Sequence, residues 1–339
     1  MLPGYAQLRW HCRGDSKLPA MRWTVRLMLA VVALAGIALA GCTQPSAGHA
    51  KRTGASAHSV AGLAALLAGL RHRRVDPAYY LSLGDSLSQG IQPDPSGVNG
   101  PTTQGYPDQL EALLRTKLPR LQLVKLGCSG ETTATMIHGG TCGYPAGSQL
   151  AEAARFLRAH RGKVAIVTID IGANDPNSCI LGQPMSHIFG CISSRITETE
   201  RNIVSIMSRL RAAAGQRVLI VGMTYYVPEL GLWKRSQTGK ELALLTEGFA
   251  AGVNQLLVER YHRYGARVAD VFGAFKSADF AGATARARAR LRGSGVPANV
   301  LAVCSLTWMC APRPRGPNEH ANAAGYHVIA QAFWRAIVG

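Results

Sequence analysis

The sequence is poor in acidic side chains. It holds 19 Asp and Glu against 37 Lys and Arg, which gives a formal net charge of +18 over 339 residues. A surface this basic attracts anionic lipids and anionic polymers. The chain lacks the zinc-finger spacings and the basic motifs interleaved with aromatic residues that typify nucleic-acid-binding proteins. We therefore expect no nucleic-acid partner, and the charge by itself says little about activity.

Metal-binding patterns are also missing. None of the 8 cysteines forms a Cys-x-x-Cys pair, and no suitable cluster of histidines accompanies them. Structural zinc sites need such closely spaced thiolates and imidazoles. We expect neither a metal nor an organic cofactor. Internal repeats are absent as well, and a hydrophobic content of 47% suffices for one sizeable core or at most two.

The N-terminal apolar run is too short for a typical membrane span. Residues 27–40 are purely apolar and follow Arg22 and Arg26, an arrangement typical of a signal peptide. The run ends in Leu-Ala-Gly before Cys42, which resembles the lipobox of bacterial lipoproteins. In that family the peptide is cut before the cysteine and the thiol is acylated. An ordinary secretory peptide, or a short anchor, with a chance cysteine is the alternative.

The lipobox resemblance divides the chain into three segments. We expect residues 1–41 to be a lipoprotein signal peptide, residues 42–76 a flexible tether and residues 77–339 the folded domain. Met21 is an alternative start, in which case residues 1–20 are not translated. The expected location is the outer face of the bacterial cell membrane, held there by the lipid, with plain secretion as the alternative.

Six cysteines remain once Cys12 and Cys42 are set aside, and they fall in three close couples. In an exported chain, an even set of this kind indicates disulfides. We predict the bridges Cys128–Cys142, Cys179–Cys191 and Cys304–Cys310. Bridges over such short distances stabilise loops more than the whole fold, because the entropy that they remove grows only with the logarithm of loop length.

Apolar runs of strand length alternate with helical patterns from residue 79 onward. Strands are expected from residue 79 and at 121–126, 164–170, 217–222 and 266–271, and helices at 106–117, 149–160, 193–214, 240–264 and 321–337. This alternation predicts a parallel sheet with helices on both faces and right-handed crossovers. The fold class is therefore α/β, a flavodoxin-like three-layer sandwich around a five-stranded parallel sheet.

Four short motifs fall where these elements meet loops. Gly84-Asp85-Ser86-Leu87 ends the first strand, Cys128-Ser129-Gly130 follows the second, Gly172-Ala173-Asn174-Asp175 follows the third, and His320 precedes the last helix. The carboxyl ends of parallel strands share one edge of a sheet, where open α/β folds bind ligands. Ser, Gly, Asn and His in this order resemble the SGNH/GDSL hydrolase family, from about residue 79 to the C-terminus. The ordered set is more specific than any single motif.

The resemblance assigns a role to each of these residues. Ser86 would attack an ester carbonyl carbon and form an acyl-enzyme. His320 would act as general base and then as general acid. The backbone N–H groups of Ser86 and Gly130 and the side-chain amide of Asn174 would form the oxyanion hole.

The sequence departs from the family at the residue that orients the histidine. Relatives usually carry an aspartate two or three residues before it, where this chain has Asn318 and Pro317. Glu319 is adjacent to His320, and neighbouring side chains in extended backbone point apart, so Glu319 is a poor substitute. We expect either a backbone carbonyl near Trp308 or the side chain of Asn318 to hold the imidazole.

Other residues near the motifs have open or structural roles. Asp85 and Asp175 are interpreted as structural carboxylates that tie loop backbone together. Tyr225, Tyr226 and Trp233 are candidates for lining an acyl channel, with ordinary packing as the alternative.

The function implied is that of an exported, lipid-anchored serine esterase or lipase, a carboxylic-ester hydrolase with a Ser-His acyl-enzyme mechanism and no cofactor. Expected substrates are ester-containing lipids, acylated small molecules or acylated polysaccharides. The chain is expected to be a monomer, held at the membrane by its N-terminal lipid. There are two alternatives. One is a deacetylase of envelope polysaccharide. The other is a surface lipoprotein that binds without catalysis, which would explain why the aspartate before the histidine is missing.

Overall fold

The computed structural model describes residues 79–176, 179, 185–279 and 296–339. The predicted signal peptide, the tether and Cys42 lie outside these residues. Within the described ranges, no helix is both long enough and apolar enough to cross a membrane.

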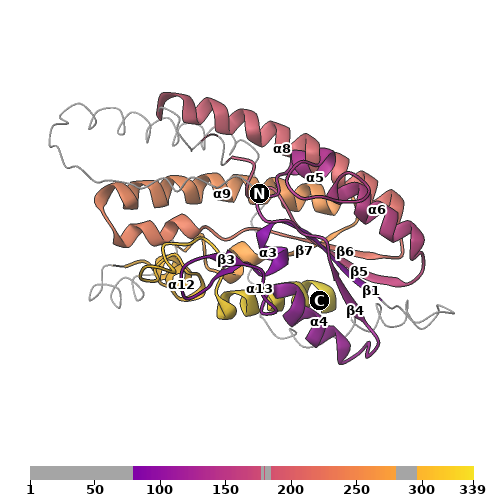
Figure 1. Cartoon of the computed structure of the whole chain (residues 1–339). Coiled ribbons are helices and arrows are strands. Elements are labelled where there is room, and N and C mark those ends of the chain that lie inside the picture. Colours follow the sequence, from indigo (N-terminus) through magenta and orange to yellow (C-terminus); the bar gives the residue numbers. More distant parts are fainter. Residues whose placement is uncertain (1–78, 177–178, 180–184, 280–295) are drawn as a thin grey trace, which may run out of the picture. The chain divides into compact units, whose positions relative to one another are not determined.

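Parallel strands form the central five-stranded sheet (Figure 1). Strand β1 (Tyr79–Gly84) lies between β4 (Gln122–Lys125) and β5 (Val164–Asp170), and β6 (Leu219–Met223) and β7 (Arg267–Ala269) follow beyond β5. The order β4-β1-β5-β6-β7 is that of flavodoxin-like folds, which confirms the predicted α/β class. All seven residues of β5 are buried, as an unbroken apolar strand requires when helices cover both faces.

The longer helices cover the two faces of the sheet. In Figure 1 one face carries α6 (Gln149–Ala159), α8 (Met185–Ala214) and α9 (Gln237–Arg263), and the other carries α4 (Tyr106–Arg115) and α13 (Ala323–Val338). The rings of Tyr106 and Phe333 stack with their centroids 4.7 Å apart, which packs α4 against α13. The layers are therefore helix, sheet and helix, as predicted.

Shorter elements lie in the loops, and the sequence did not predict them. They are α3 (Ser86–Gln89), β2 (Gln92–Pro93), β3 (Asn99–Gly100), α5 (Thr133–His138), the 3₁₀ helix η1 (Pro228–Lys234), α10 (Val271–Ala274) and α12 (Ala298–Leu306). Local side-chain caps start several of them. The Asp85 carboxylate accepts from the N–H of Leu87 at 3.0 Å at the start of α3, and Thr132 and Thr135 form a capping box before α5.

Capping side chains also explain why some helices and strands begin or end at residues other than those predicted. The Asp270 carboxylate accepts from the N–H of Gly273 at 2.8 Å and begins α10, so the fifth strand ends at Ala269 instead of residue 271. The Ser236 hydroxyl accepts from the N–H of Gly239 at 3.0 Å, so α9 begins before the expected residue 240. A single capping side chain is enough to decide where such an element starts.

The three predicted disulfides are present in the described part of the chain. They join Cys128 to Cys142, Cys179 to Cys191 and Cys304 to Cys310. The first closes the loop after β4, and the third joins α12 to the segment that leads toward α13. Two of the bridges therefore lie in loops that carry predicted site residues.

Gly222 of β6 is required by packing. A Cβ atom there would lie 2.4 Å from Cε2 of Tyr261, whose ring is fully buried in α9. Because the ring has no free space to enter, Gly222→Ala is expected to lower the free energy of unfolding by about 3 kcal/mol in urea denaturation. Gly248→Ala in α9 is the control, since a Cβ there meets nothing within 4 Å. It should raise the same free energy by about 0.5–1 kcal/mol, and equal effects of the two substitutions would contradict this account.

Candidate active site

Ser86 lies directly beyond β1, in the first turn of α3. The turn before it depends on Gly84, whose φ is +134° and whose Cβ, if present, would lie 2.1 Å from the backbone oxygen of Asp170. The N–H of Asp85 donates to that same oxygen at 3.0 Å. The chain therefore passes from strand to helix through one residue and places Ser86, which is 9% exposed, at the edge of the sheet.

The loops after β4 and β5 are hydrogen-bonded to each other. The side-chain amide of Asn174 donates at 2.9 Å to the backbone oxygen of Glu131, the neighbour of Gly130. The Asp175 carboxylate accepts from the N–H of Thr133 at 3.0 Å and from the hydroxyl of the same residue. Asn174 and the Gly130 loop are thus adjacent, as an oxyanion hole built from both would require. Asp175 ties loop backbone together, as expected.

Gln149, which the sequence did not single out, joins this loop to β1. Its side-chain oxygen accepts from the N–H of Gly84 at 2.7 Å. Its amide donates to the oxygen of Gly84 and to the carboxylate of Glu131, each at 2.9 Å. The residue is fully buried. No local pattern signals this role, because the contact with Gly84 spans 65 residues of sequence.

Asn318 holds the imidazole of His320. Its Oδ1 lies 2.8 Å from Nδ1 of the ring and accepts the backbone N–H of His320 at 3.0 Å. A backbone N–H can only donate, so the Asn318 atom in contact is the carbonyl oxygen, and Nδ1 must carry the proton that binds it. Nδ2 of Asn318 donates in turn to Asn99 at 2.7 Å. The lone pair of the neutral ring is therefore on Nε2, where a base needs it.

Of the two alternatives expected to hold the ring, the side chain of Asn318 contacts it, and the backbone carbonyl of Trp308 is paired elsewhere. It accepts the backbone N–H groups of Ala311 at 3.2 Å and of Asn318 at 3.3 Å. The N–H of Trp308 donates to the backbone oxygen of His320 at 3.0 Å. Its peptide groups are thus paired with backbone, and this pairing leaves the side chain of Asn318 to contact the imidazole.

Burial governs the protonation of His320. The side chain is 6% exposed, and the loss of hydration lowers the pKa of His320 to about 4. At neutral pH the ring is therefore uncharged, and Nε2 can accept a proton.

The acid limb of the pH–rate profile should follow this low pKa. For an uncharged ester, kcat/KM is expected to fall with an apparent pKa of about 4, instead of the ordinary histidine value of about 6.5. Activity at pH 5 should thus stay near its plateau. Asn318→Asp would place a carboxylate against Nδ1, raise the pKa of His320 and move the limb toward neutral pH. A limb near 6.5 in the unmodified protein, or one that Asn318→Asp leaves in place, would count against this assignment.

Two buried carboxyl groups lie beneath Ser86. Asp170, the last residue of β5, accepts from the Tyr106 hydroxyl and from the N–H of Asp85, while Asp85 accepts from the Tyr225 hydroxyl at 2.9 Å. Burial raises the pKa of both, and the charge of Asp85 raises the pKa of Asp170 further. Asp85 thus has the structural role expected of it. Asp170 was missed, although an acid that ends an apolar strand is a visible signal.

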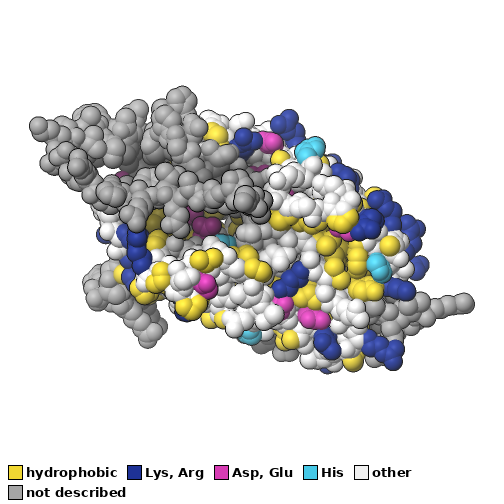
Figure 2. Space-filling view, viewed as in Figure 1, with side chains coloured by type: hydrophobic (Ala, Val, Ile, Leu, Met, Phe, Trp, Pro, Cys, Tyr) yellow, Lys and Arg dark blue, Asp and Glu magenta, His cyan; other side chains and the backbone are white. Residues whose placement is uncertain are grey.

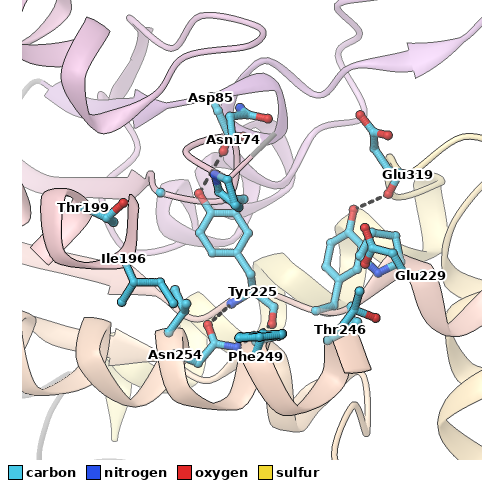
Figure 3. Close-up of a pocket in the computed structure, with 18 of the residues that line it drawn as sticks. Asp85, Asn174, Ile196, Thr199, Tyr225, Glu229, Thr246, Phe249, Asn254 and Glu319 are labelled. Atoms are coloured by element: carbon cyan, nitrogen blue, oxygen red, sulfur yellow. Dashed lines mark hydrogen bonds between the residues drawn. The ribbon is translucent and has the colours of Figure 1, made fainter. Parts of the chain in front are cut away.

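A cavity of about 250 Å³ opens at this edge of the sheet (Figure 3). Its lining includes Ser86, Asn174 and His320. Tyr225 and Tyr226 also line it, whereas Gly130 does not, and Trp233 instead packs against the core. In the described part of the chain, no group of three or more His, Cys, Asp or Glu side chains is placed to hold a metal ion. The cavity therefore brings together a hydroxyl, an imidazole and a side-chain amide from three separate segments of the chain.

The chain resembles known proteins in sequence and in structure. The model of the GDSL-like Lipase/Acylhydrolase family matches residues 82–328. No curated protein matches the chain. An acetylxylan esterase from Geobacillus stearothermophilus is 19% identical, with a TM-score of 0.43 over 77% of this chain and 94% of that one. Phospholipase A1 from Streptomyces albidoflavus is 18% identical, with a TM-score of 0.44 over 74% and 95%. Similarities this low do not transfer the substrates of those two proteins to this chain.

Proposed function

Because the chain belongs to the GDSL-like lipase/acylhydrolase family, we propose that it is a serine esterase or lipase that cleaves carboxylic esters through an acyl-enzyme on Ser86. Family membership makes it a hydrolase that acts on esters. The observation that carries the finer assignment is the shared cavity. Ser86 follows β1, Asn174 follows β5 and His320 precedes α13. All three side chains nevertheless line the same cavity.

The geometry suggests how each step would proceed. The carbonyl oxygen of Asn318 accepts a hydrogen bond from Nδ1–H of His320. Nε2 is therefore free to take the hydroxyl proton of Ser86 as Oγ bonds to the carbonyl carbon. The amide of Asn174 and the backbone N–H of Ser86 stabilise the oxyanion. Gly130, which the resemblance assigns to the same role, does not line the cavity. The bond to the alcohol then breaks, and Nε2 returns the proton to the alcohol oxygen. Water repeats the sequence on the acyl-enzyme and releases the acid.

A burst experiment tests this proposal. With p-nitrophenyl acetate, rapid mixing should release about one equivalent of nitrophenolate per protein before steady turnover, because an acyl-enzyme accumulates. A fluorophosphonate ester should then block turnover, and peptide mass spectrometry should find it on Ser86. Modification of another serine would overturn the assignment of the nucleophile. An absence of both turnover and labelling would favour a lipoprotein that binds without catalysis.

The proposed location is the outer face of the cell membrane, with residues 1–41 removed and Cys42 acylated. Support comes from the basic residues, the apolar run and the Leu-Ala-Gly-Cys end of this segment. The test is expression of the full chain in a bacterium fed a labelled fatty acid. Label should enter the protein and remain absent from Cys42→Ala. Release of unlabelled protein into the medium would instead indicate plain secretion.

A second candidate substrate class is acetylated envelope polysaccharide. The cavity of about 250 Å³ is below the range of about 300–1,000 Å³ that accommodates drug-sized ligands, so it favours a short acyl group. Release of acetate from an acetylated polysaccharide at a rate near that for p-nitrophenyl acetate would support this candidate.

A further inference from the structure

The cavity is acidic, although the chain is basic. Asp85, Glu229 and Glu319 line it, and among the described residues Arg195 is the only Lys or Arg that does so. The guanidinium of Arg195 is paired with Glu198 at 2.6 Å, which offsets its charge. On the face shown in Figure 2, basic side chains are spread over the surface and acidic ones are sparse. Among the described residues, the cavity lining therefore holds three acidic side chains and one basic one, the opposite balance from that of the whole chain.

The two glutamates belong to one side of the cavity. Glu229 is the second residue of η1, and Glu319 directly precedes His320. The hydroxyl of Tyr226 donates to the backbone oxygen of Glu319 at 2.8 Å and joins the two segments. Figure 3 shows both glutamates on the same side of Tyr225. Burial raises the pKa of Glu229, and the charge of Glu319, whose side chain is exposed, raises the pKa of Glu229 further, as expected for two acids close together.

The opposite side is mainly apolar, although Arg195 and Thr199 of α8 also line it. Ile192 and Ile196 reach the cavity from α8, and Phe249 and Val253 reach it from α9. In Figure 3 Ile196 lies across Tyr225 from the glutamates. These four side chains present neither charge nor hydrogen-bonding groups, so this half suits a short hydrocarbon chain.

The chemistry of ester cleavage assigns each half to one part of the substrate. As Ser86 Oγ bonds to the carbonyl carbon and the bond to the alcohol breaks, the serine proton passes through His320 to the departing oxygen. The alcohol must therefore leave beside His320, on the side of Glu319. The acyl chain takes the opposite direction, toward the apolar half between α8 and α9.

We propose that this cavity selects its leaving group by charge: it accepts esters of cationic alcohols best, esters of neutral alcohols next, and esters of phosphate-bearing alcohols poorly. The inference rests on the proposed esterase function and narrows it. Glu229 and Glu319 attract a cation held beside them and repel a phosphate, in a partly closed site where charges are less screened than in water. The acyl group that fits the apolar half is short.

Three butyrate esters of closely similar size test the inference. Butyrylcholine is cationic, 3,3-dimethylbutyl butyrate is its neutral isostere, and 2-phosphoethyl butyrate is anionic. At pH 8 and low ionic strength, kcat/KM should fall about tenfold from the first ester to the second and about tenfold again to the third. Added salt should reduce both ratios. Hydrolysis of the anionic ester as fast as the neutral one would overturn the inference.

Variants identify the residues responsible. In the double variant Glu229→Gln, Glu319→Gln, the ratio of kcat/KM for the cationic ester to that for the anionic ester should fall at least about tenfold. Glu247→Gln is the matched control, because Glu247 follows the cavity residue Thr246 in α9 but does not itself line the cavity. The ratio of the two kcat/KM values in Glu247→Gln should equal that of the unmodified protein. A ratio unchanged in the double variant would overturn the role of the glutamates.

Turnover of the neutral ester distinguishes a failure of the charge selection from a failure of the esterase function. If the unmodified protein cleaves 3,3-dimethylbutyl butyrate but shows no preference by charge, the esterase function stands and the charge selection is wrong. If it cleaves none of the three esters, nor p-nitrophenyl acetate, the proposed function itself is wrong and the inference falls with it.

Discussion

Ser86→Ala is expected to lower kcat for a short-chain p-nitrophenyl ester by a factor on the order of 10⁴ to 10⁶. The substitution removes the only atom that forms a bond to the substrate in the proposed mechanism. The oxyanion donors and the cavity remain, so residual turnover should exceed the uncatalysed rate. Stopped-flow absorbance at saturating ester measures kcat, and the burst of nitrophenolate should disappear.

Ser208→Ala serves as the control for this substitution. Ser208 is an exposed residue of α8 that does not line the cavity. Its variant should keep the kcat and the burst of the unmodified protein. Substantial turnover by Ser86→Ala, with a melting temperature equal to that of the control, would show that another group is the nucleophile.

Asn174→Ala is expected to lower kcat by about 100- to 1,000-fold with little change in KM. The proposed hydrogen bond from its amide is strongest when the carbonyl oxygen carries a negative charge, so its loss raises the barrier more than it weakens substrate binding. Steady-state kinetics on the same ester separate the two constants. The amide also donates to the backbone oxygen of Glu131 at 2.9 Å, so the melting temperature must be measured in parallel.

Asn202→Ala distinguishes catalysis from support of the loop. Asn202 donates at 3.0 Å to the hydroxyl of Thr133, the first residue of α5 and two residues beyond the Glu131 that Asn174 contacts, but Asn202 does not line the cavity. We expect its variant to lose less than about tenfold in kcat. Equal losses in the two variants would mean that Asn174 acts only through the loop.

The strands, and the sheet edge at which Ser86 and Asn174 lie, were predictable because their signals are local. An unbroken apolar run such as residues 164–170 can only be a buried strand or a buried helix, and its length favours the strand. Once five such strands are parallel, every loop that follows one of them lies at the same edge. The sequence alone therefore predicts Ser86 and Asn174 at that edge. The disulfides were predictable for the same reason, because the two cysteines of each bridge lie close together in the sequence.

The choice of partner for His320 was not predictable from the sequence. Trp308 and Asn318 were both available, and the structure brings Asn318 to the ring because the peptide groups of Trp308 are paired with backbone. Two of the three hydrogen bonds in that pairing, to Asn318 and to His320, join residues ten or more positions apart. Gln149 was missed for a similar reason, since its partner Gly84 is 65 residues away.

The sequence by itself determined the α/β layers, the disulfide couples and the set of residues at one sheet edge, because apolar period, turn chemistry and spacing act over a few residues. Only the tertiary structure decided which atom holds the imidazole, and that, among the described residues, three acids and one base line the cavity of a chain with a net charge of +18. Both depend on which side chains face one another across distant segments. Neither the composition nor the local sequence patterns indicate which of these side chains face one another.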